Sequence, residues 1–345
     1  MATTELGRLL RLRGDLHIGY VDSTALRGNA LGDPTERPVP VYTPPGYDPE
    51  GSRRYATLYV LHGYSGDAAA LVGARQWESN VVQWIDRLIE RGSMQPALLA
   101  IVDGFTRLGG SQYMDSIHNG NYAAYTVRDV VGHVDAQYRT IAREGGRAVL
   151  GKSSGGFGSL HLSMMCPGTF CAFASHSGDT NFRAAAVPSF ADAQRELEKH
   201  DNDIGAFVTA FESSFKRKPP EFSTMEMIGY ASCYSPRAAE RWAIDLPWDA
   251  RTGEIRDDVF ARWRAFDPIE VCLQKRSELE RLRLRYVDCG RRDEYALDIG
   301  ARILVQRMRD LGLEVRHEEF DDDHRNIGYR YAVSLPALGA VLDNP

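Results

Sequence analysis

The stretch GKSSGG (residues 151–156) decides the fold. A predicted strand (147–150) precedes it, and a segment of helical character (157–165) follows it. The pattern G-x-S-x-G is common by chance, but between a strand and a helix it is typical of a nucleophile elbow, a sharp turn that presents a serine hydroxyl above a sheet. Glycines beside the serine let the neighbouring backbone approach without a Cβ clash. The stretch therefore predicts Ser153 as a nucleophile.

Two other interpretations of the same stretch are weaker. A glycine-rich phosphate loop would need a different spacing and a Lys-Ser/Thr pair at its end, which GKSSGG lacks. Ser154 is a second candidate nucleophile, but only Ser153 has a glycine two positions away on each side.

Outward from this turn, apolar runs alternate with segments of helical periodicity. The runs that are apolar on both faces, as in central parallel strands, are 57–61, 97–102, 148–150 and 284–287. The segments with apolar residues at helical spacing are 81–89, 127–138 and 297–311. Such alternation predicts a mostly parallel sheet with helices on both faces. Together with the elbow, it predicts the α/β class and the α/β-hydrolase fold.

One stretch, 179–265, interrupts the alternation with many aromatic residues and little strand character. Regular structure restarts at 267–268, an aspartate N-cap followed by a proline at the first helical position. We expect one domain over 1–345, with its core formed by 1–178 and 266–345. The helical insertion either covers the site as a cap or forms a small layer without a role in substrate binding.

A serine hydroxyl is a weak nucleophile at neutral pH and needs a general base that a third group orients. In this fold the partners follow in the order serine, acid, histidine. His324 lies in a loop directly after the last predicted strand (315–320), and this position makes it the predicted base. His317 lies inside that strand and is expected to be structural.

The acid is expected in the turn after the strand 284–287. Asp293, where this turn opens into a helix, is the leading candidate. Glu294 and Asp288 are its rivals, because both lie in or beside the same turn. A carboxylate that does not hold the histidine would cap the helix or pair with a nearby arginine.

Acyl transfer also needs hydrogen-bond donors for the developing oxyanion. The segment LHGYSGD (61–67) follows an apolar strand, where this fold places its first donor. The backbone N–H groups of Tyr64 and Ser154 are therefore the predicted oxyanion hole. An ordinary glycine turn is the alternative for 61–67.

Further pocket walls are expected at the carboxyl ends of the strands, where ligands of open parallel sheets bind. The loop 102–113 belongs to this edge. Tyr113, Trp77 and Asp179 are candidate substrate-binding residues, and each could instead be structural.

Composition excludes several classes of protein. The net charge of −6 and the absence of a run of lysines and arginines argue against a nucleic-acid partner. No stretch of about 18 apolar residues occurs, so no membrane span is expected. The N-terminus lacks the features of a secretory signal, although a trimmed signal stays open. Five cysteines without metal-type spacing indicate free thiols, no bound metal and a cytoplasmic protein.

Several motifs, in this order, resemble those of the putative-esterase family, which includes esterase D (S-formylglutathione hydrolase), feruloyl esterases, enterochelin esterases and the mycolyltransferases of the antigen 85 type. They are LHGYSGD (61–67), DGFTRLGGSQYMDS (103–116), GKSSGG (151–156), HSGD (176–179), CGRRDEY (289–295) and DDDH (321–324). The resemblance runs from about residue 40 to 335.

This resemblance implies a serine carboxylester hydrolase or acyltransferase that uses neither a metal nor an organic cofactor. By motif it implies Ser153, Asp293 and His324 as the catalytic residues. The chain departs from the family pattern in Lys152, where an uncharged residue is more usual, and in its long aromatic insertion. Both departures concern the identity of the substrate and not the type of reaction.

Three functions follow as hypotheses. The first is hydrolysis of a small-molecule carboxylic ester through an acyl-enzyme. The second is acyl transfer by the same triad to an alcohol, amine or thiol. The third is a non-catalytic binding protein on a hydrolase scaffold, although such proteins usually lack the nucleophile or the base. The sequence leaves the oligomeric state open, with a homodimer as one candidate.

Overall fold

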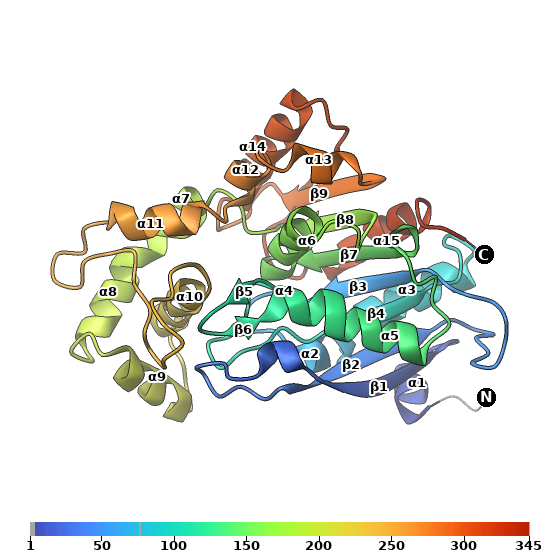
Figure 1. Cartoon of the computed structure of the whole chain (residues 1–345), viewed down its shortest axis with the longest axis horizontal. Coiled ribbons are helices and arrows are strands. Elements are labelled where there is room, and N and C mark those ends of the chain that lie inside the picture. Colours follow the sequence, from blue (N-terminus) through green and yellow to red (C-terminus); the bar gives the residue numbers. More distant parts are fainter. Residues whose placement is uncertain (1–3, 76, 345) are drawn as a thin grey trace.

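The structure is a computed structural model that describes residues 4–75 and 77–344. An eight-stranded sheet in the order β1-β2-β4-β3-β7-β8-β9-β10 forms its centre (Figure 1). The strands are β1 (Asp15–Asp22), β2 (Glu36–Thr43), β3 (Thr57–Leu61), β4 (Leu98–Val102), β7 (Arg147–Lys152), β8 (Ala172–His176), β9 (Leu284–Gly290) and β10 (Arg316–Phe320). A separate short ribbon pairs β5 (Asp115–Ser116) with β6 (Gly120–Asn121).

The sheet is parallel from β4 to β10, and β1 and β2 add an antiparallel edge. The helices are α1 (Glu5–Leu9), α2 (Ala68–Val72), α3 (Val81–Glu90), α4 (Tyr122–Ala124), α5 (Val131–Gln137), α6 (Ser154–Met165), α7 (Phe182–Ala185), α8 (Phe190–Glu198), α9 (Ile204–Ser213), α10 (Pro219–Tyr234), α11 (Asp257–Arg264), α12 (Pro268–Val271), α13 (Arg276–Glu280), α14 (Leu297–Asp310) and α15 (Tyr331–Gly339). This arrangement confirms the predicted fold class.

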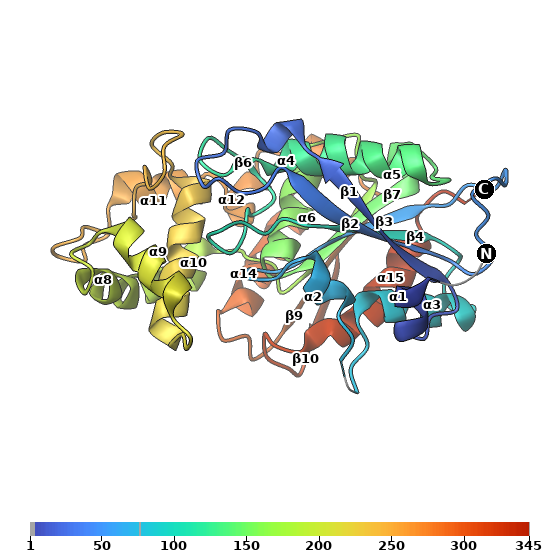
Figure 2. The ribbon, with the colours of Figure 1, turned by 90° about the horizontal axis from the view of Figure 1, so that it is seen from below.

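The central strands β3, β4 and β8 are buried on both faces, as the two-sided apolar runs predict. In β3, Leu58 and Val60 pack with α3 and α15 on one face, whereas Tyr59 and Leu61 pack with α5 and α6 on the other. Figure 2 shows α3 and α15 on one side of the sheet and α4 and α5 on the opposite side. Burial on both faces explains why these strands lack the alternating pattern of a half-exposed strand.

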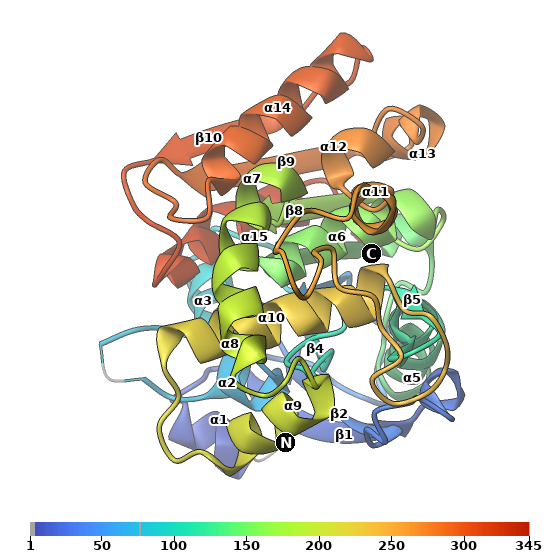
Figure 3. The ribbon, with the colours of Figure 1, turned by 90° about the vertical axis from the view of Figure 1, so that its left-hand side faces the viewer.

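Helices α7 to α11 form a separate layer beyond one end of the sheet, with α10 running across it (Figure 3). Aromatic side chains supply much of its core, among them Phe190, Phe207, Trp248 and Trp263. Phe157 of α6 belongs to the same apolar cluster, so the layer packs directly on the helix that follows the elbow. In the described part of the chain, no helix combines the length and the apolar character that a membrane crossing needs.

Candidate active site

Ser153 lies between β7 and α6, in a strained turn. Its backbone has φ 57° and ψ −125°, a region that a residue with a side chain rarely adopts. A Cβ at Gly155 would lie 2.2 Å from the carbonyl oxygen of Leu61, so only glycine fits there. The Ser153 N–H donates to the His176 carbonyl of β8 at 2.9 Å. The turn thus holds the serine at the carboxyl end of the parallel strands.

A chain of hydrogen bonds joins Ser153, His324 and Asp293. The Ser153 Oγ lies 3.0 Å from His324 Nε2, and His324 Nδ1 lies 2.8 Å from Asp293 Oδ2. The Asp293 side chain is fully buried, and that of His324 is 10% exposed. Because a carboxylate only accepts hydrogen bonds, Nδ1 carries the proton and leaves the Nε2 lone pair for the serine O–H.

Electrostatics keep Asp293 ionised. Burial alone would raise the pKa of its carboxyl group, but the hydrogen bond and charge of His324 and the backbone N–H of Tyr295 outweigh burial and lower that pKa below its usual value. A charged Asp293 accepts the hydrogen bond from His324 Nδ1 and so fixes the orientation of the imidazole ring.

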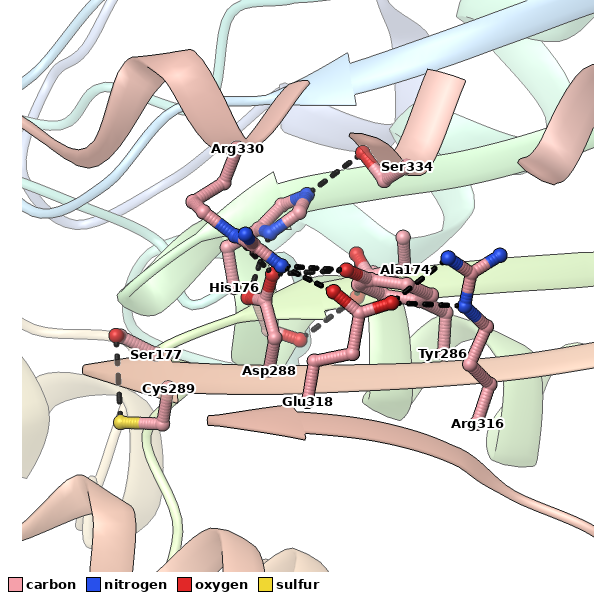
Figure 4. Close-up of polar contacts among 12 residues, drawn as sticks. Ala174, His176, Ser177, Tyr286, Asp288, Cys289, Arg316, Glu318, Arg330 and Ser334 are labelled. Carbon is pink, nitrogen blue, oxygen red and sulfur yellow. Dashed lines mark hydrogen bonds and ion pairs between the residues drawn. The ribbon is translucent and has the colours of Figure 1, made fainter. Parts of the chain in front are cut away.

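Asp288, a rival for the acid, belongs to a different network (Figure 4). Its Oδ1 lies 2.7 Å from His176 Nδ1, and its Oδ2 accepts from Arg330 Nε at 2.8 Å. The His176 Nε2 in turn lies 2.8 Å from Ser334 Oγ. This chain has the same order of groups as the one at Ser153. It is wholly buried, however, so no substrate reaches Ser334.

The side chain of Glu294, the other rival, contacts the backbone of the loop that carries His324. Its carboxylate accepts the His324 N–H at 3.0 Å and pairs with Arg325 at 3.3 Å. Glu294 therefore fixes the loop, while the contact with the His324 ring is made by Asp293.

The loop after β3 lies against Ser153. A Cβ at Gly63 would be 3.4 Å from the Ser153 Cβ. The backbone N–H groups of Tyr64 and Ser154 have no hydrogen-bond acceptor within residues 4–75 and 77–344. The Tyr64 hydroxyl donates to the Leu108 carbonyl at 2.9 Å, which holds the loop in place. Two unused donors beside a strained serine are the arrangement that an oxyanion requires.

The three predicted wall residues lie in different places. Asp179 lies in the wall of a cavity of about 590 Å³ that contains Ser153 and His324. Trp77 is 94% exposed and lies at an adjoining cavity. Tyr113 lies behind the wall, fully buried, where its hydroxyl donates to the His62 carbonyl at 2.9 Å.

Helix α10 contributes residues to the wall of this cavity, and these residues were not predicted from the sequence. Glu226 and Tyr230 line it, and the Tyr230 hydroxyl donates to Asp179 Oδ2 at 2.9 Å. The same oxygen accepts from Gln112 at 3.0 Å and from the Ser154 hydroxyl at 3.1 Å. One signal was present, because Glu226 is the only charged residue between 222 and 234. An isolated charge in an apolar helix often marks a polar cavity.

Glu226 should make the stability of the protein depend on pH. Burial, reinforced by the charge of Asp179, raises its pKa from 4.5 to about 8. The folded protein therefore holds one more proton than the unfolded chain between these values, and the free energy of unfolding falls as pH rises through this range. In Glu226→Gln this fall should shrink by roughly 1–3 kcal/mol, less than the full shift implies because the side chain is partly exposed.

Urea unfolding at pH 5 and pH 8 measures this difference. The exposed Glu240→Gln, in the same helical layer, is the matched control and should keep the wild-type pH dependence. Equal pH dependence in all the proteins would contradict a protonated Glu226.

Comparison with known proteins defines the class. A ferulic acid esterase superposes with a TM-score of 0.59 at 17% identity, over 96% of this chain and 100% of that one. The S-formylglutathione hydrolase of Agrobacterium tumefaciens superposes with a TM-score of 0.54 at 13% identity, over 96% and 97% of the two chains. The fold is that of the α/β-hydrolase esterases.

The family follows from the sequence comparison. The model of the family described as "Putative esterase" matches residues 29–332, and the chain belongs to that family. Esterase Rv1288 of Mycobacterium tuberculosis is 27% identical over 146 residues, which are 42% of this chain and 30% of the relative. The chain thus matches less than a third of the length of this relative.

Proposed function

We propose that the protein hydrolyses a small-molecule carboxylic ester through an acyl-enzyme. Ser153 is the nucleophile, His324 the general base, Asp293 the group that orients the imidazole, and the N–H groups of Tyr64 and Ser154 the oxyanion hole. The observation that carries this proposal is the continuous hydrogen-bonded chain from Ser153 to the buried Asp293, at the wall of a cavity large enough for a small molecule.

The reaction has two halves. His324 Nε2 takes the Ser153 proton as Oγ attacks the ester carbonyl carbon, and the carbonyl oxygen becomes an oxyanion between the two N–H donors. The imidazolium then gives its proton to the leaving alcohol oxygen as the C–O bond breaks. In the second half, water loses a proton to His324 and attacks the acyl carbon. The imidazolium then gives this proton to Ser153 Oγ as the bond between Oγ and the acyl carbon breaks, which releases the acid and restores both residues.

The substrate cavity is lined partly by the helical layer. Phe182 of α7, Phe222, Tyr230 and Tyr234 of α10 and Trp263 of α11 face it. Their apolar surface supports an acyl group that is itself apolar or aromatic. Asp179 adds a polar group beside the oxyanion hole, where it holds the Ser154 hydroxyl.

Partitioning with methanol tests the acyl-enzyme. Esters of one acid with different alcohols pass through the same acyl-enzyme, so each should give the same ratio of methyl ester to free acid at one methanol concentration. A ratio that varies with the leaving alcohol would exclude a common intermediate. A ratio dominated by the methyl ester at millimolar methanol would identify the protein as an acyltransferase.

A further inference from the structure

A second cavity adjoins the one that holds Ser153. Its volume is about 620 Å³, and the two share Gly63, Arg75, Lys152 and Arg325 in their walls. Because these residues line both cavities, the two cavities lie side by side, with Lys152 in the wall of each. The second cavity is therefore within reach of a substrate bound at Ser153.

The second cavity is strongly cationic. Its charged lining side chains are four cations, Arg75, Arg87, Lys152 and Arg325, and one carboxylate, Glu78. The chain as a whole carries a net charge of −6. The positive lining is therefore a local feature that runs against the charge of the protein.

Two of these cations already have ionic partners. Arg75 lies 3.1 Å from Glu78, and Arg325 lies 3.3 Å from Glu294. Arg87 donates to the Ser79 hydroxyl at 2.6 Å and has no ion pair among residues 4–75 and 77–344. The ammonium group of Lys152 has neither a hydrogen bond nor an ion pair within the described residues, whereas the backbone of Lys152 pairs with β8.

Lys152 is half-buried beside the nucleophile, where an unpaired charge is costly to desolvate. Burial lowers the pKa of its ammonium group, although Asp293, Glu294 and Asp323 oppose this effect. Those carboxylates are engaged elsewhere: Asp293 with His324, Glu294 with Arg325, and Asp323 with the Arg325 N–H at 2.7 Å. An anionic group of a ligand would pair with the Lys152 ammonium group and so offset the free-energy cost of desolvating it.

The position of His324 indicates which half of the ester enters this cavity. The imidazolium must reach the leaving oxygen, so the alcohol half lies on the histidine side of the scissile bond. Arg325 to Tyr329, which directly follow His324, line the second cavity. The carboxylates of Asp179 and Glu226, by contrast, line the first cavity and not the second.

We propose that the preferred substrate carries an anionic group, a carboxylate or a phosphate, on its alcohol half, and that Lys152 with Arg87 holds this group in the second cavity. This proposal rests on the proposed ester hydrolysis at Ser153. Arg75 and Arg325 widen the cationic surface, and the ring of Trp84, beneath Arg87, offers a flat face for the body of the alcohol.

Paired model esters test this preference. The substrates are 4-acetoxybenzoate and the neutral 4-acetoxybenzamide, with each kcat/KM divided by the rate constant for hydroxide-catalysed hydrolysis. The wild type should favour the benzoate by about tenfold or more at low ionic strength, and the preference should shrink as salt screens the cations. Lys152→Gln and the exposed Arg87→Gln should each lose most of it, and Lys152→Glu should reverse it. Lys216→Gln, an exposed lysine outside both cavities, should keep it.

The outcomes separate the two proposals. Hydrolysis of both esters that is lost in Ser153→Ala, without any preference for the benzoate, would overturn the anionic subsite and leave the esterase proposal standing. Hydrolysis that survives in Ser153→Ala would overturn the esterase proposal itself. Competition by benzoate and phenyl phosphate then identifies the group, since the stronger inhibitor matches it. A benzoate preference that persists unchanged in both Lys152→Gln and Arg87→Gln would also exclude the subsite.

Discussion

Ser153→Ala is expected to lower kcat for a carboxylic ester by about 10⁴- to 10⁶-fold. The variant lacks the oxygen that forms the acyl-enzyme, while the oxyanion donors and the cavity remain and support only residual hydrolysis. Alanine fits the space, and the strain at φ 57° is unchanged, so the fold should persist. Initial rates with a 4-nitrophenyl ester measure the loss of kcat, and circular dichroism checks that the fold persists.

Ser154→Ala is the matched control. Its N–H, the proposed oxyanion donor, stays in place, and only the hydroxyl bond to Asp179 is lost. We expect a loss of tenfold or less. A severe loss of activity in Ser154→Ala, together with near-normal activity in Ser153→Ala, would identify Ser154 as the nucleophile.

Asp293→Asn is expected to lower kcat by about 10³- to 10⁴-fold. An amide in place of the carboxylate can donate to His324 Nδ1 and so favour the tautomer whose Nε2 carries the proton. That tautomer cannot accept the Ser153 proton. The loss of the buried negative charge also removes the stabilisation of the imidazolium. KM should change much less than kcat, because the side chain does not line the substrate cavity.

Glu294→Gln is the control for this carboxylate. The amide keeps an acceptor for the His324 backbone N–H but loses the ion pair with Arg325, so the loop should loosen and activity should fall about tenfold at most. Steady-state kinetics of the two variants with one ester decide between the neighbours. A larger loss in Glu294→Gln than in Asp293→Asn would reject Asp293 as the acid.

The fold could be predicted because its signals are local. The glycines of GKSSGG are needed because of contacts within one turn and with β3. The apolar runs reflect only the burial of both faces of the central strands. The positions of His324 and Asp293 could be predicted for a similar reason, since each lies in the loop after a strand whose place in the sheet the topology determines.

The rest of the site depends on long-range packing. No motif links Glu226 and Tyr230 of α10 to Asp179, and only the packing of the aromatic layer on α6 brings them together. For the same reason Tyr113, in a motif that borders the site, lies behind the wall. A close-range pattern specifies where a loop begins, but the packing around it decides which side chains enter the cavity.

The proposed mechanism requires that Ser153 is an activated serine. Reaction with a fluorophosphonate probe, followed by intact mass and peptide mapping, tests it directly. We expect one adduct per chain, on Ser153, and the loss of this adduct in His324→Ala. An adduct on another residue, labelling of Ser153 that persists in His324→Ala, or no adduct on the folded protein would contradict it.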